Sequence, residues 1–524
     1  MLPYMDKSGP FARFMVEGKP FIMLAGELHN SSASSLAYME PIWPRLREFG
    51  LNTVLAPVSW ELLEPEEGRF DFTLVQGLLD QAGRQGLKLV LLWFGTWKNA
   101  SSTYVPAWVK LDRTRFFHAV NADGSQNRAI SPFCREAREA DAAAFTRLME
   151  YLREHDSDRT VLAVQVENES GLLGTARDHS PEARRTYQSP VPDVLLTYLK
   201  ENHAVLAPWL RERYDAGKQS GTWPEVFGPA APEIFSACAV AEYIGDIGRR
   251  GKAAYPLPLL ANAWTVQCPD EPAGRFPSGG PVARVHDIWR YAAPSIDILA
   301  PDLYLENFPE ECRAYTRISG NPLFIPELRR DKWASASVFY AVGEHRALCV
   351  SPFGIDSLAG QERAAGDPDT AVQEVVKAQG QSDASSLSMT YAILSDLHPL
   401  LCDGAFSVRG FMQDRLPSHF LPMRDTELQI SYPNPLDSGK DPAGGLVIAS
   451  DADTFLIAGA GFQIAFFPKE YSWTPLEYLD VEEGYWEDGK WVCYRRLNGD
   501  EMRLPFPDKP TMRRYRILRD PREE

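Results

Sequence analysis

The first 400 residues alternate short apolar runs with longer segments of helical periodicity. Such alternation is typical of βα units wound around a parallel sheet. Strands in such a sheet are covered on both faces, so they consist of nearly continuous apolar residues. This pattern predicts eight strands, at residues 21–28, 53–60, 87–95, 161–169, 257–264, 296–304, 321–328 and 347–354.

Helical patterns separate these runs. Residues 40–50 carry apolar side chains at helical spacing and end at Gly50, a residue type that suits the position just after a helix. Similar patterns occur at residues 72–86, 137–155, 234–251 and 386–401. Eight strands that alternate with eight helices predict a closed (β/α)₈ TIM barrel.

The pattern changes near residue 404. Beyond it, short alternating runs such as TELQISY and TFLIAGA are separated by Pro, Gly, Asn and Asp. Period-two alternation between turn residues is typical of antiparallel strands. With 524 residues the chain also exceeds what one core usually supports. We therefore expect a catalytic barrel over residues 1–403 and a smaller all-β, sandwich-like domain over residues 404–524.

Two long connections interrupt the predicted barrel, one over residues 170–235 after the fourth strand and one over residues 356–385 after the eighth. Segments that follow barrel strands lie at the C-terminal face, where barrel enzymes bind their substrates. We expect these two segments to close one end of a cleft into a pocket.

Composition narrows the classes of partner. The formal charge of −17 argues against nucleic acid, because binding a polyanion requires clustered Lys and Arg. Seven scattered cysteines without a CxxC pair argue against a disulfide framework or structural zinc. The sequence contains no run of 18 apolar residues, so it predicts no membrane-spanning helix. The N-terminus lacks the apolar segment of a secretion signal. The expected location is cytoplasmic for a complete sequence, and periplasmic or secreted for a trimmed one.

The strongest chemical motif is VQVENESG at residues 164–171. Glu167, Asn168 and Glu169 lie where an apolar strand ends, and burying carboxylates there is costly unless they are paired or used. Strict alternation would place Glu167 and Glu169 on one face and Asn168 on the other. Periodicity alone therefore leaves open which glutamate reaches a ligand.

The second carboxylate is Glu327 in FIPELRRD, at the end of the seventh predicted strand. An ion pair with Arg329 or Arg330 is the structural alternative. Two carboxylates at the C-terminal ends of different barrel strands suit glycosidic cleavage, in which one donates a proton to the leaving oxygen and the other attacks from the opposite face. A spacing of about 5–5.5 Å between the carboxyl groups corresponds to retention of configuration.

These motifs resemble glycoside hydrolase clan A, whose barrels carry Asn-Glu on strand four and a glutamate nucleophile on strand seven. Within the clan, NTVLAPVSWELLEPEEGRFDF at 52–72 and VQVENESG resemble family 35 β-galactosidases. The resemblance implies that Glu169 is the acid/base, that Glu327 is the nucleophile and that Asn168 binds the sugar 2-hydroxyl. It also implies that Tyr304 lies near the nucleophile.

Three departures from the family pattern leave other sugars open. Pro57 stands where the family has a tyrosine, and Glu61 stands where it has an asparagine. The family's Cys-Ala-Glu stretch is replaced by FGTWKNASSTYVPAW at 94–108. These positions ordinarily contact galactose hydroxyls.

Sugar rings stack on aromatic faces and bind fixed polar groups at their edges. Aromatic and polar residues of this kind lie beside the predicted strand ends and in the long connection after strand four. They are Trp60, Glu61, Trp97, Lys98, Asn99, Asn262, Trp264 and Trp223, with Glu27 after the first strand as a hydroxyl acceptor. No His/Asp/Glu cluster has the spacing of metal ligands, so we expect no metal and no cofactor.

Together these features predict an exo-acting, retaining β-glycosidase. β-Galactosidase activity on terminal galactosides of plant-type oligosaccharides is favoured, and the partner is then a small oligosaccharide, with a homo-oligomer left open. The alternatives are the same chemistry on a β-glucoside, β-mannoside or arabinopyranoside, and a carbohydrate-binding protein without catalysis.

Overall fold

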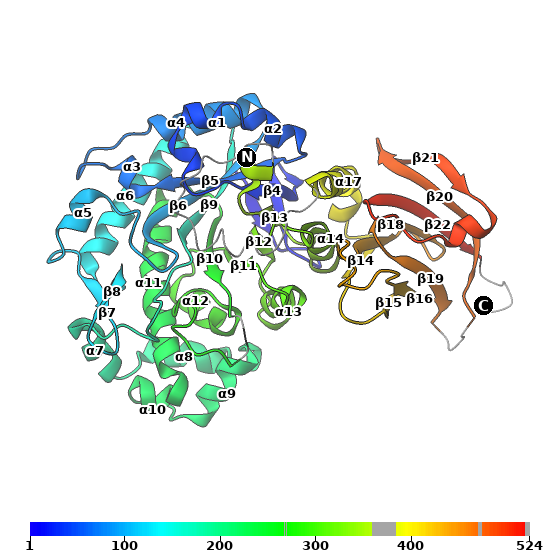
Figure 1. The fold of residues 1–524 in the computed structure, drawn as a ribbon. Coiled ribbons are helices and arrows are strands. Elements are labelled where there is room, and N and C mark those ends of the chain that lie inside the picture. The colour runs from blue at the N-terminus through cyan, green and yellow to red at the C-terminus, as the bar shows by residue number, and fades with distance from the viewer. Residues whose placement is uncertain (267, 269, 359–383, 470–473, 519–524) are drawn as a thin grey trace.

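The computed structural model describes residues 1–266, 268, 270–358, 384–469 and 474–518. Most of the predicted connection 356–385 therefore lies outside the described residues. Eight parallel strands close into a barrel in chain order, which confirms the predicted (β/α)₈ architecture (Figure 1). They are β4 (Met23–Glu27), β5 (Thr53–Ser59), β6 (Lys88–Lys98), β9 (Val161–Asn168), β10 (Leu259–Trp264), β11 (Ile298–Leu303), β12 (Phe324–Leu328) and β13 (Cys349–Pro352).

Helices cover the outside of the barrel, as the periodicity predicts. The principal ones are α2 (Trp43–Glu48), α4 (Thr73–Arg84), α6 (Arg135–His155), α11 (Ala231–Ala254), α12 (His286–Ala292), α13 (Phe308–Arg313), α14 (Ala334–His345) and α17 (Ala384–Cys402). Gly50 follows α2 with a φ of +103°, which few other residues adopt, and this confirms its predicted role at the end of the helix.

Further short helices and strands lie in the connections of the barrel and before its first strand. The connection after β9 holds α7 (Pro181–Gln188), α8 (Asp193–Glu201), α9 (Pro208–Ala216) and α10 (Trp223–Phe227), which group at the lower end of Figure 1. The others are β1 (Tyr4–Asp6), β2 (Arg13–Val16), β3 (Lys19–Pro20), α1 (Leu36–Met39), α3 (Trp60–Leu63), α5 (Ala107–Leu111), β7 (His118–Val120), β8 (Gln126–Ile130) and α15 (Ile355–Leu358).

The C-terminal part is an antiparallel sandwich, as predicted. One sheet has the order β14 (Ser407–Met412), β17 (Gly444–Ala449), β18 (Thr454–Ala460), β22 (Thr511–Leu518), β20 (Glu477–Glu487) and β21 (Lys490–Leu497). The other contains β15 (Ser418–Met423), β16 (Thr426–Ser431) and β19 (Gln463–Pro468). Buried residues of both sheets, such as Val447 and Phe466, belong to one core.

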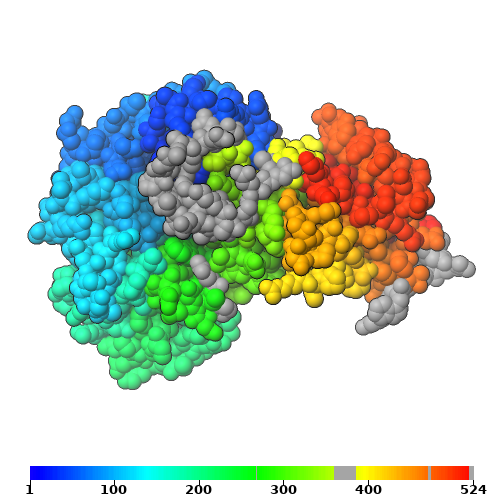
Figure 2. Space-filling view, viewed as in Figure 1, coloured from blue at the N-terminus to red at the C-terminus, as the bar shows by residue number. Residues whose placement is uncertain are grey.

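The sandwich packs against the barrel through α14 and α17, which lie between the two parts in Figure 1, and the two parts adjoin in Figure 2. Leu446 and Ile448 of β17 belong to the same buried cluster as the barrel helices. Trp486 and Trp491 also pack against that cluster. Arg409 of β14 donates to Glu344 of α14 at 2.7 Å.

The change from barrel to sandwich falls between α17 and β14, and the boundary at residues 403/404 stays a prediction. Among the described residues no helix combines the length and apolar character that crossing a bilayer requires.

Candidate active site

Three carboxylates meet at the C-terminal ends of the barrel strands. Glu169 follows β9, Asp302 lies in β11 and Glu327 lies in β12. One carboxylate oxygen from each lies within 4.8 Å of the others, and all three residues are at most 6% exposed. The sequence predicts the meeting of Glu169 with Glu327. Asp302 was not predicted.

The backbone around Glu167 decides which side chains face this group. Glu167 has a φ of +63° and Glu169 a φ of +44°, a left-handed conformation that interrupts the strand. Glu167 points away from the group and accepts hydrogen bonds from the backbone N–H groups of Thr96 and Trp97 at 3.0 and 2.5 Å. Asn168 and Glu169 both turn toward Glu327. Strict alternation therefore does not hold here, which is why periodicity could not settle the choice.

Two donors hold the carboxylate of Glu327. The Tyr304 hydroxyl donates to Oε2 at 2.6 Å and the Asn168 side-chain amide donates to Oε1 at 3.2 Å. Hydrogen bonds to a carboxylate favour its ionised form and fix its orientation. Arg329, the partner in the structural alternative, instead donates to Asp331 through Nε at 2.7 Å.

Glu169 has a different environment. Burial and the negative charge of Glu327 raise its pKa to about 8, in spite of nearby Lys98. Its backbone N–H donates to Oδ1 of Asn262 at 2.9 Å, so β10 anchors it in place. A neutral carboxyl group that faces a second carboxylate is the arrangement from which an acid and a nucleophile can be built.

Lys98 and Glu27 complete the charged group. Burial disfavours the Lys98 ammonium, but the carboxylates of Glu327 and Glu169 outweigh burial and raise its pKa. Its Nζ donates to Oδ1 of Asn168 at 2.9 Å. Glu27 is fully buried and neither of its oxygens has a hydrogen-bond partner; burial first, then Glu327, raises its pKa well above the usual range.

Three of the aromatic residues expected to face the sugar are buried in this structure. Trp60, Trp97 and Trp223 are at most 3% exposed. Trp60 donates to Glu64 at 2.8 Å, and Trp97 donates to a backbone carbonyl at 3.2 Å. These side chains fill the barrel's outer core, which one sequence cannot distinguish from a binding face.

Of the other predicted sugar contacts, one lies beside the carboxylates and two make contacts elsewhere. Trp264 is half-buried and pairs in register with Asp302, so it lies at the rim of the carboxylate group. Glu61 instead binds Lys110 at 2.8 Å and is half-exposed, so its contacts do not support a sugar-binding role. The side chain of Asn99 is exposed, and its backbone N–H donates to the Asn168 carbonyl at 3.2 Å.

Sequence reasoning missed several buried polar side chains of the barrel strands. Gln165, Ser351 and Asp302 are at most 3% exposed, and each has at least one polar atom without a partner. Buried polar atoms are usually hydrogen-bonded, so these unpartnered atoms are exceptions that a polar ligand or water would satisfy. The available signal was a polar residue inside each of three otherwise apolar runs: Gln165 within LAVQV, Asp302 within ILAPDL and Ser351 within CVSP.

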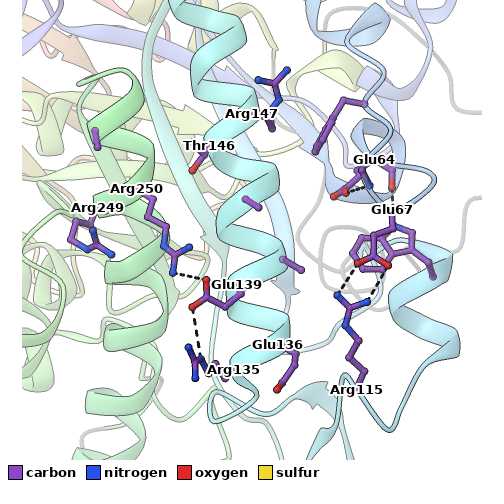
Figure 3. Close-up of a pocket in the computed structure, with 16 residues that line it drawn as sticks. Glu64, Glu67, Arg115, Arg135, Glu136, Glu139, Thr146, Arg147, Arg249 and Arg250 are labelled. Atoms are coloured by element: carbon purple, nitrogen blue, oxygen red, sulfur yellow. Dashed lines mark hydrogen bonds and ion pairs between the residues drawn. The ribbon is translucent and has the colours of Figure 1, made fainter.

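Neither the cluster of acidic oxygens nor the outer cavity of the barrel indicates a second site. Among the described residues, Glu169, Asp302 and Glu327 are the group whose oxygens are close enough to share a cation, but acidic proximity alone assigns no metal. A cavity of about 920 Å³ lies on the outside of the barrel beside α6 and α11, and none of these three carboxylates lines it (Figure 3). Its charged side chains largely pair with one another, as Glu67 does with Arg115 at 2.7 Å.

Comparisons with known proteins bear on this geometry. Residues 37–227 match the model of glycoside hydrolase family 42, described as beta-galactosidase. Residues 387–505, which begin inside α17, match a domain of unknown function, DUF5597. The matching family is 42, whereas the motifs resemble family 35, so the comparisons support the resemblance at the level of clan A.

Curated relatives match part of the chain. A beta-galactosidase of Xanthomonas manihotis is 27% identical over 202 residues, which cover 37% of this chain and 31% of the relative. Beta-galactosidase-1-like protein 3 of Homo sapiens is 24% identical over 205 residues, covering 37% of this chain and 28% of the relative. The match thus spans about a third of the length of these relatives.

Solved structures are similar at low identity. The beta-galactosidase from Marinomonas ef1 has a TM-score of 0.48 and 16% identity, covering 72% of this chain and 60% of that chain. The beta-amylase catalytic domain from Paenibacillus polymyxa has a TM-score of 0.47 and 12% identity, covering 68% and 98%.

Proposed function

We propose that this protein is a retaining, exo-acting β-glycosidase whose preferred substrate is a terminal β-galactoside, with Glu169 as acid/base and Glu327 as nucleophile. The observation that carries the proposal is the meeting of these two carboxylates within 4.8 Å at the ends of the fourth and seventh barrel strands. That distance joins individual oxygens, and it is compatible with the separation of about 5–5.5 Å between carboxyl groups in retaining enzymes.

The reaction takes place in two displacements. In the first, Glu327 attacks the anomeric carbon while Glu169 gives its proton to the leaving glycosidic oxygen, so the C–O bond breaks as the glycosyl–Glu327 ester forms. In the second, Glu169 takes a proton from water, which attacks the anomeric carbon and releases the sugar and the Glu327 carboxylate. Protons and charges balance over the cycle.

The protonation states required for the first step match the two environments. A pKa of about 8 keeps Glu169 protonated at neutral pH, ready to act as an acid. The two donors on Glu327, Tyr304 and Asn168, stabilise the carboxylate that must attack. As a glycosyl ester forms, the charge on Glu327 disappears and the pKa of Glu169 falls, which suits its second role as a base.

Galactose is favoured because the matching family model and the curated relatives carry the name beta-galactosidase. In the proposed complex, Asn168 binds the 2-hydroxyl, Trp264 lies against the sugar at the rim, and Lys98 and Glu27 lie within reach of other hydroxyls. The family 35 assignment and the plant-type oligosaccharide substrate belong to this proposal as well.

The first test is a panel of nitrophenyl glycosides. We expect the β-galactoside to give the highest kcat/KM, with retention of configuration in the first-formed sugar observed by NMR. A higher kcat/KM on the β-glucoside, β-mannoside or arabinopyranoside would replace galactose and leave the mechanism intact. An inverted product would contradict the assignment of Glu327 as nucleophile.

The second test uses Glu327→Gln and Glu169→Gln. We expect Glu327→Gln to lower kcat by at least about 10³-fold, because the amide is a poor nucleophile. Glu169→Gln should lower activity by about 10²–10⁴-fold on substrates with poor leaving groups and less on nitrophenyl glycosides, which depart without full protonation. The exposed Glu66, which binds Arg69, supplies the control Glu66→Gln with unchanged kinetics.

These variants also distinguish a carbohydrate-binding protein without catalysis. In that case the wild-type protein would bind galactose and hydrolyse no glycoside of the panel, and Glu327→Gln would change neither property.

A further inference from the structure

Asp302 is an acidic residue inside an otherwise apolar barrel strand, β11. It pairs in register with Glu327 of the adjacent strand β12, so the two side chains project on the same side of the sheet. It is 3% exposed. A carboxyl group in this position is costly unless it is neutral or stabilised by donors.

The two oxygens of Asp302 have unequal surroundings. Oδ2 accepts a hydrogen bond from the Asn262 side-chain amide at 2.8 Å, whereas Oδ1 has no partner. The same Asn262 amide accepts the backbone N–H of Glu169 through its own Oδ1 at 2.9 Å. Asn262 therefore joins Asp302 to the backbone of the proposed acid/base, and the free oxygen of Asp302 is the atom that could carry a proton.

The charges that surround Asp302 limit its protonation state. Glu327 on β12, Glu169 after β9 and Glu27 on β4 are acidic, and Lys98 on β6 is the one cation among the described groups that act on it. The charge of Asp302 also acts on the phenols of Tyr304 and Tyr315. If Glu327 is the ionised nucleophile, a second carboxylate so close is strongly disfavoured. Burial, followed by Glu327 and Glu169, accordingly raises the pKa of Asp302 well above its ordinary range.

We propose that Asp302 stays protonated through the catalytic cycle and acts as a positioning residue, whose O–H donates a hydrogen bond to the Glu169 carboxylate that forms once Glu169 has protonated the leaving group. This inference rests on the proposed function. No proton leaves Asp302: Glu169 loses its proton to the glycosidic oxygen, accepts the hydrogen bond from Asp302, and regains a proton from water in the second displacement.

The proposal gives Asp302 a role that neither a sugar ligand nor a structural carboxylate would have. A neutral donor beside Glu169 stabilises the carboxylate form and so lowers the pKa of Glu169 relative to the same site without the donor. An ionised Asp302 would do the opposite. The pH dependence of kcat/KM therefore distinguishes these cases. At alkaline pH kcat/KM falls as Glu169 of the substrate-free enzyme loses its proton.

The experiment compares Asp302→Asn and Asp302→Leu with the wild-type protein over pH 5–10, using a galactoside with a poor leaving group. Asn preserves neutral charge, shape and an N–H donor. The alkaline limb of the pH profile of kcat/KM should therefore move by less than about 0.3 pH unit. Leu removes the donor, so the limb should move up by about one unit and kcat should fall at least tenfold. The control Asp297→Asn, at the opposite end of β11 where Asp297 binds Lys252, should leave the limb unchanged.

Two outcomes overturn the proposal. If Asp302→Asn lowers the limb by a unit or more, Asp302 is ionised in the wild-type protein. If Asp302→Leu folds normally and leaves the limb in place, Asp302 does not donate to Glu169. Should the Leu variant fail to fold, Asp302→Ala gives the same comparison.

An infrared measurement tests the protonation without relying on activity. In the difference spectrum of wild-type minus Asp302→Asn at neutral pH, we expect a carboxylic acid carbonyl band, and a carboxylate band in its place would refute the proposal. A wild-type protein that hydrolyses no glycoside would refute the proposed function, whereas activity combined with a carboxylate band would refute only the role of Asp302.

Discussion

At the scale of single residues, the site combines several costly features. Glu169 adopts a left-handed φ of +44°, Glu27 buries two unpartnered oxygens, and Asp302 lies beside Glu327. A non-glycine residue held in such a backbone conformation costs on the order of 1–3 kcal/mol, and it persists only where surrounding contacts determine it. Here the backbone N–H of Ala100 donates to the Glu169 carbonyl at 3.0 Å, and Asn262 binds its N–H. Such a concentration of strain is typical of functional sites.

Glu27 provides a test of this cost. Its pKa is raised in the folded state, so the unfolded chain releases the proton at lower pH than the folded protein does. Stability from this group is therefore complete below the ordinary pKa of a glutamate and is lost as pH rises toward the folded pKa. Glu27→Gln, which has no proton to lose, should match the wild-type thermal midpoint at pH 4 and exceed it by roughly 1–3 °C at pH 9. Differential scanning calorimetry at the two pH values measures this.

The same variant should leave KM for the preferred glycoside close to the wild-type value at neutral pH, because Gln keeps an oxygen acceptor and a donor as the neutral carboxyl does. The control Glu66→Gln, at an exposed position, should have the thermal midpoint of the wild-type protein at both pH values. A wild-type midpoint above that of Glu27→Gln at pH 9 would mean that Glu27 is ionised and stabilised by a partner, in contradiction to its burial without one.

At the scale of elements, the packing of α14 against β14 depends on two glycines. A Cβ at Gly343 would lie 2.8 Å from the Cα of Gly410 and 2.8 Å from the Cβ of Leu446. A Cβ at Gly410 would lie 2.6 Å from the backbone nitrogen of Glu344. Neither neighbour is the flexible end of a side chain, so the helix and the strand can approach this closely only without side chains.

Gly343→Ala should therefore destabilise the protein, although alanine favours helices. Forcing a methyl group into this contact costs about 1–3 kcal/mol, more than the gain of up to about 1 kcal/mol in helix propensity. Chemical denaturation measures the change. The matched control is Gly83→Ala in α4, where the new Cβ would meet only the Thr160 hydroxyl at 3.8 Å and stability should stay equal or rise. Equal effects of the two substitutions would contradict the packing argument.

At the scale of the whole molecule, barrel and sandwich share buried surface. Leu446, Ile448 and Met512 of the sandwich belong to the same buried cluster as α14 and α17 of the barrel. Separating the two parts would expose this apolar surface to water, at a cost of roughly 25 cal/mol per Å². The two parts should therefore depend on each other for stability, even though the carboxylate group lies wholly in the barrel.

Truncation after residue 403 tests that dependence. We expect the 1–403 fragment to be poorly soluble or to unfold at least 10 °C below the full chain, because the outer faces of α14 and α17 become exposed patches. Solubility after expression and circular dichroism on heating measure this. A soluble fragment with the thermal midpoint and kcat/KM of the full chain would contradict the proposed dependence.

The sequence alone determined the barrel, its eight strands and the sandwich, because these follow from local periodicity that one chain carries in full. It also determined that Glu169 and Glu327 meet, since the C-terminal ends of parallel barrel strands converge on one face. These predictions needed only the order of the elements and the residue at the end of each strand.

The tertiary structure decided what depends on neighbours distant in sequence. A left-handed turn at Glu167 sent that side chain outward and Glu169 inward, which no alternation rule contains. Trp60, Trp97 and Trp223 are part of the core. Trp60 packs against Trp108 and Trp97 against Tyr243, and contacts so distant in sequence are not visible in a local pattern. Asp302 joined the site only because register placed it against Glu327. Periodicity specifies elements, whereas the direction and protonation of a side chain depend on what the closed barrel places beside it.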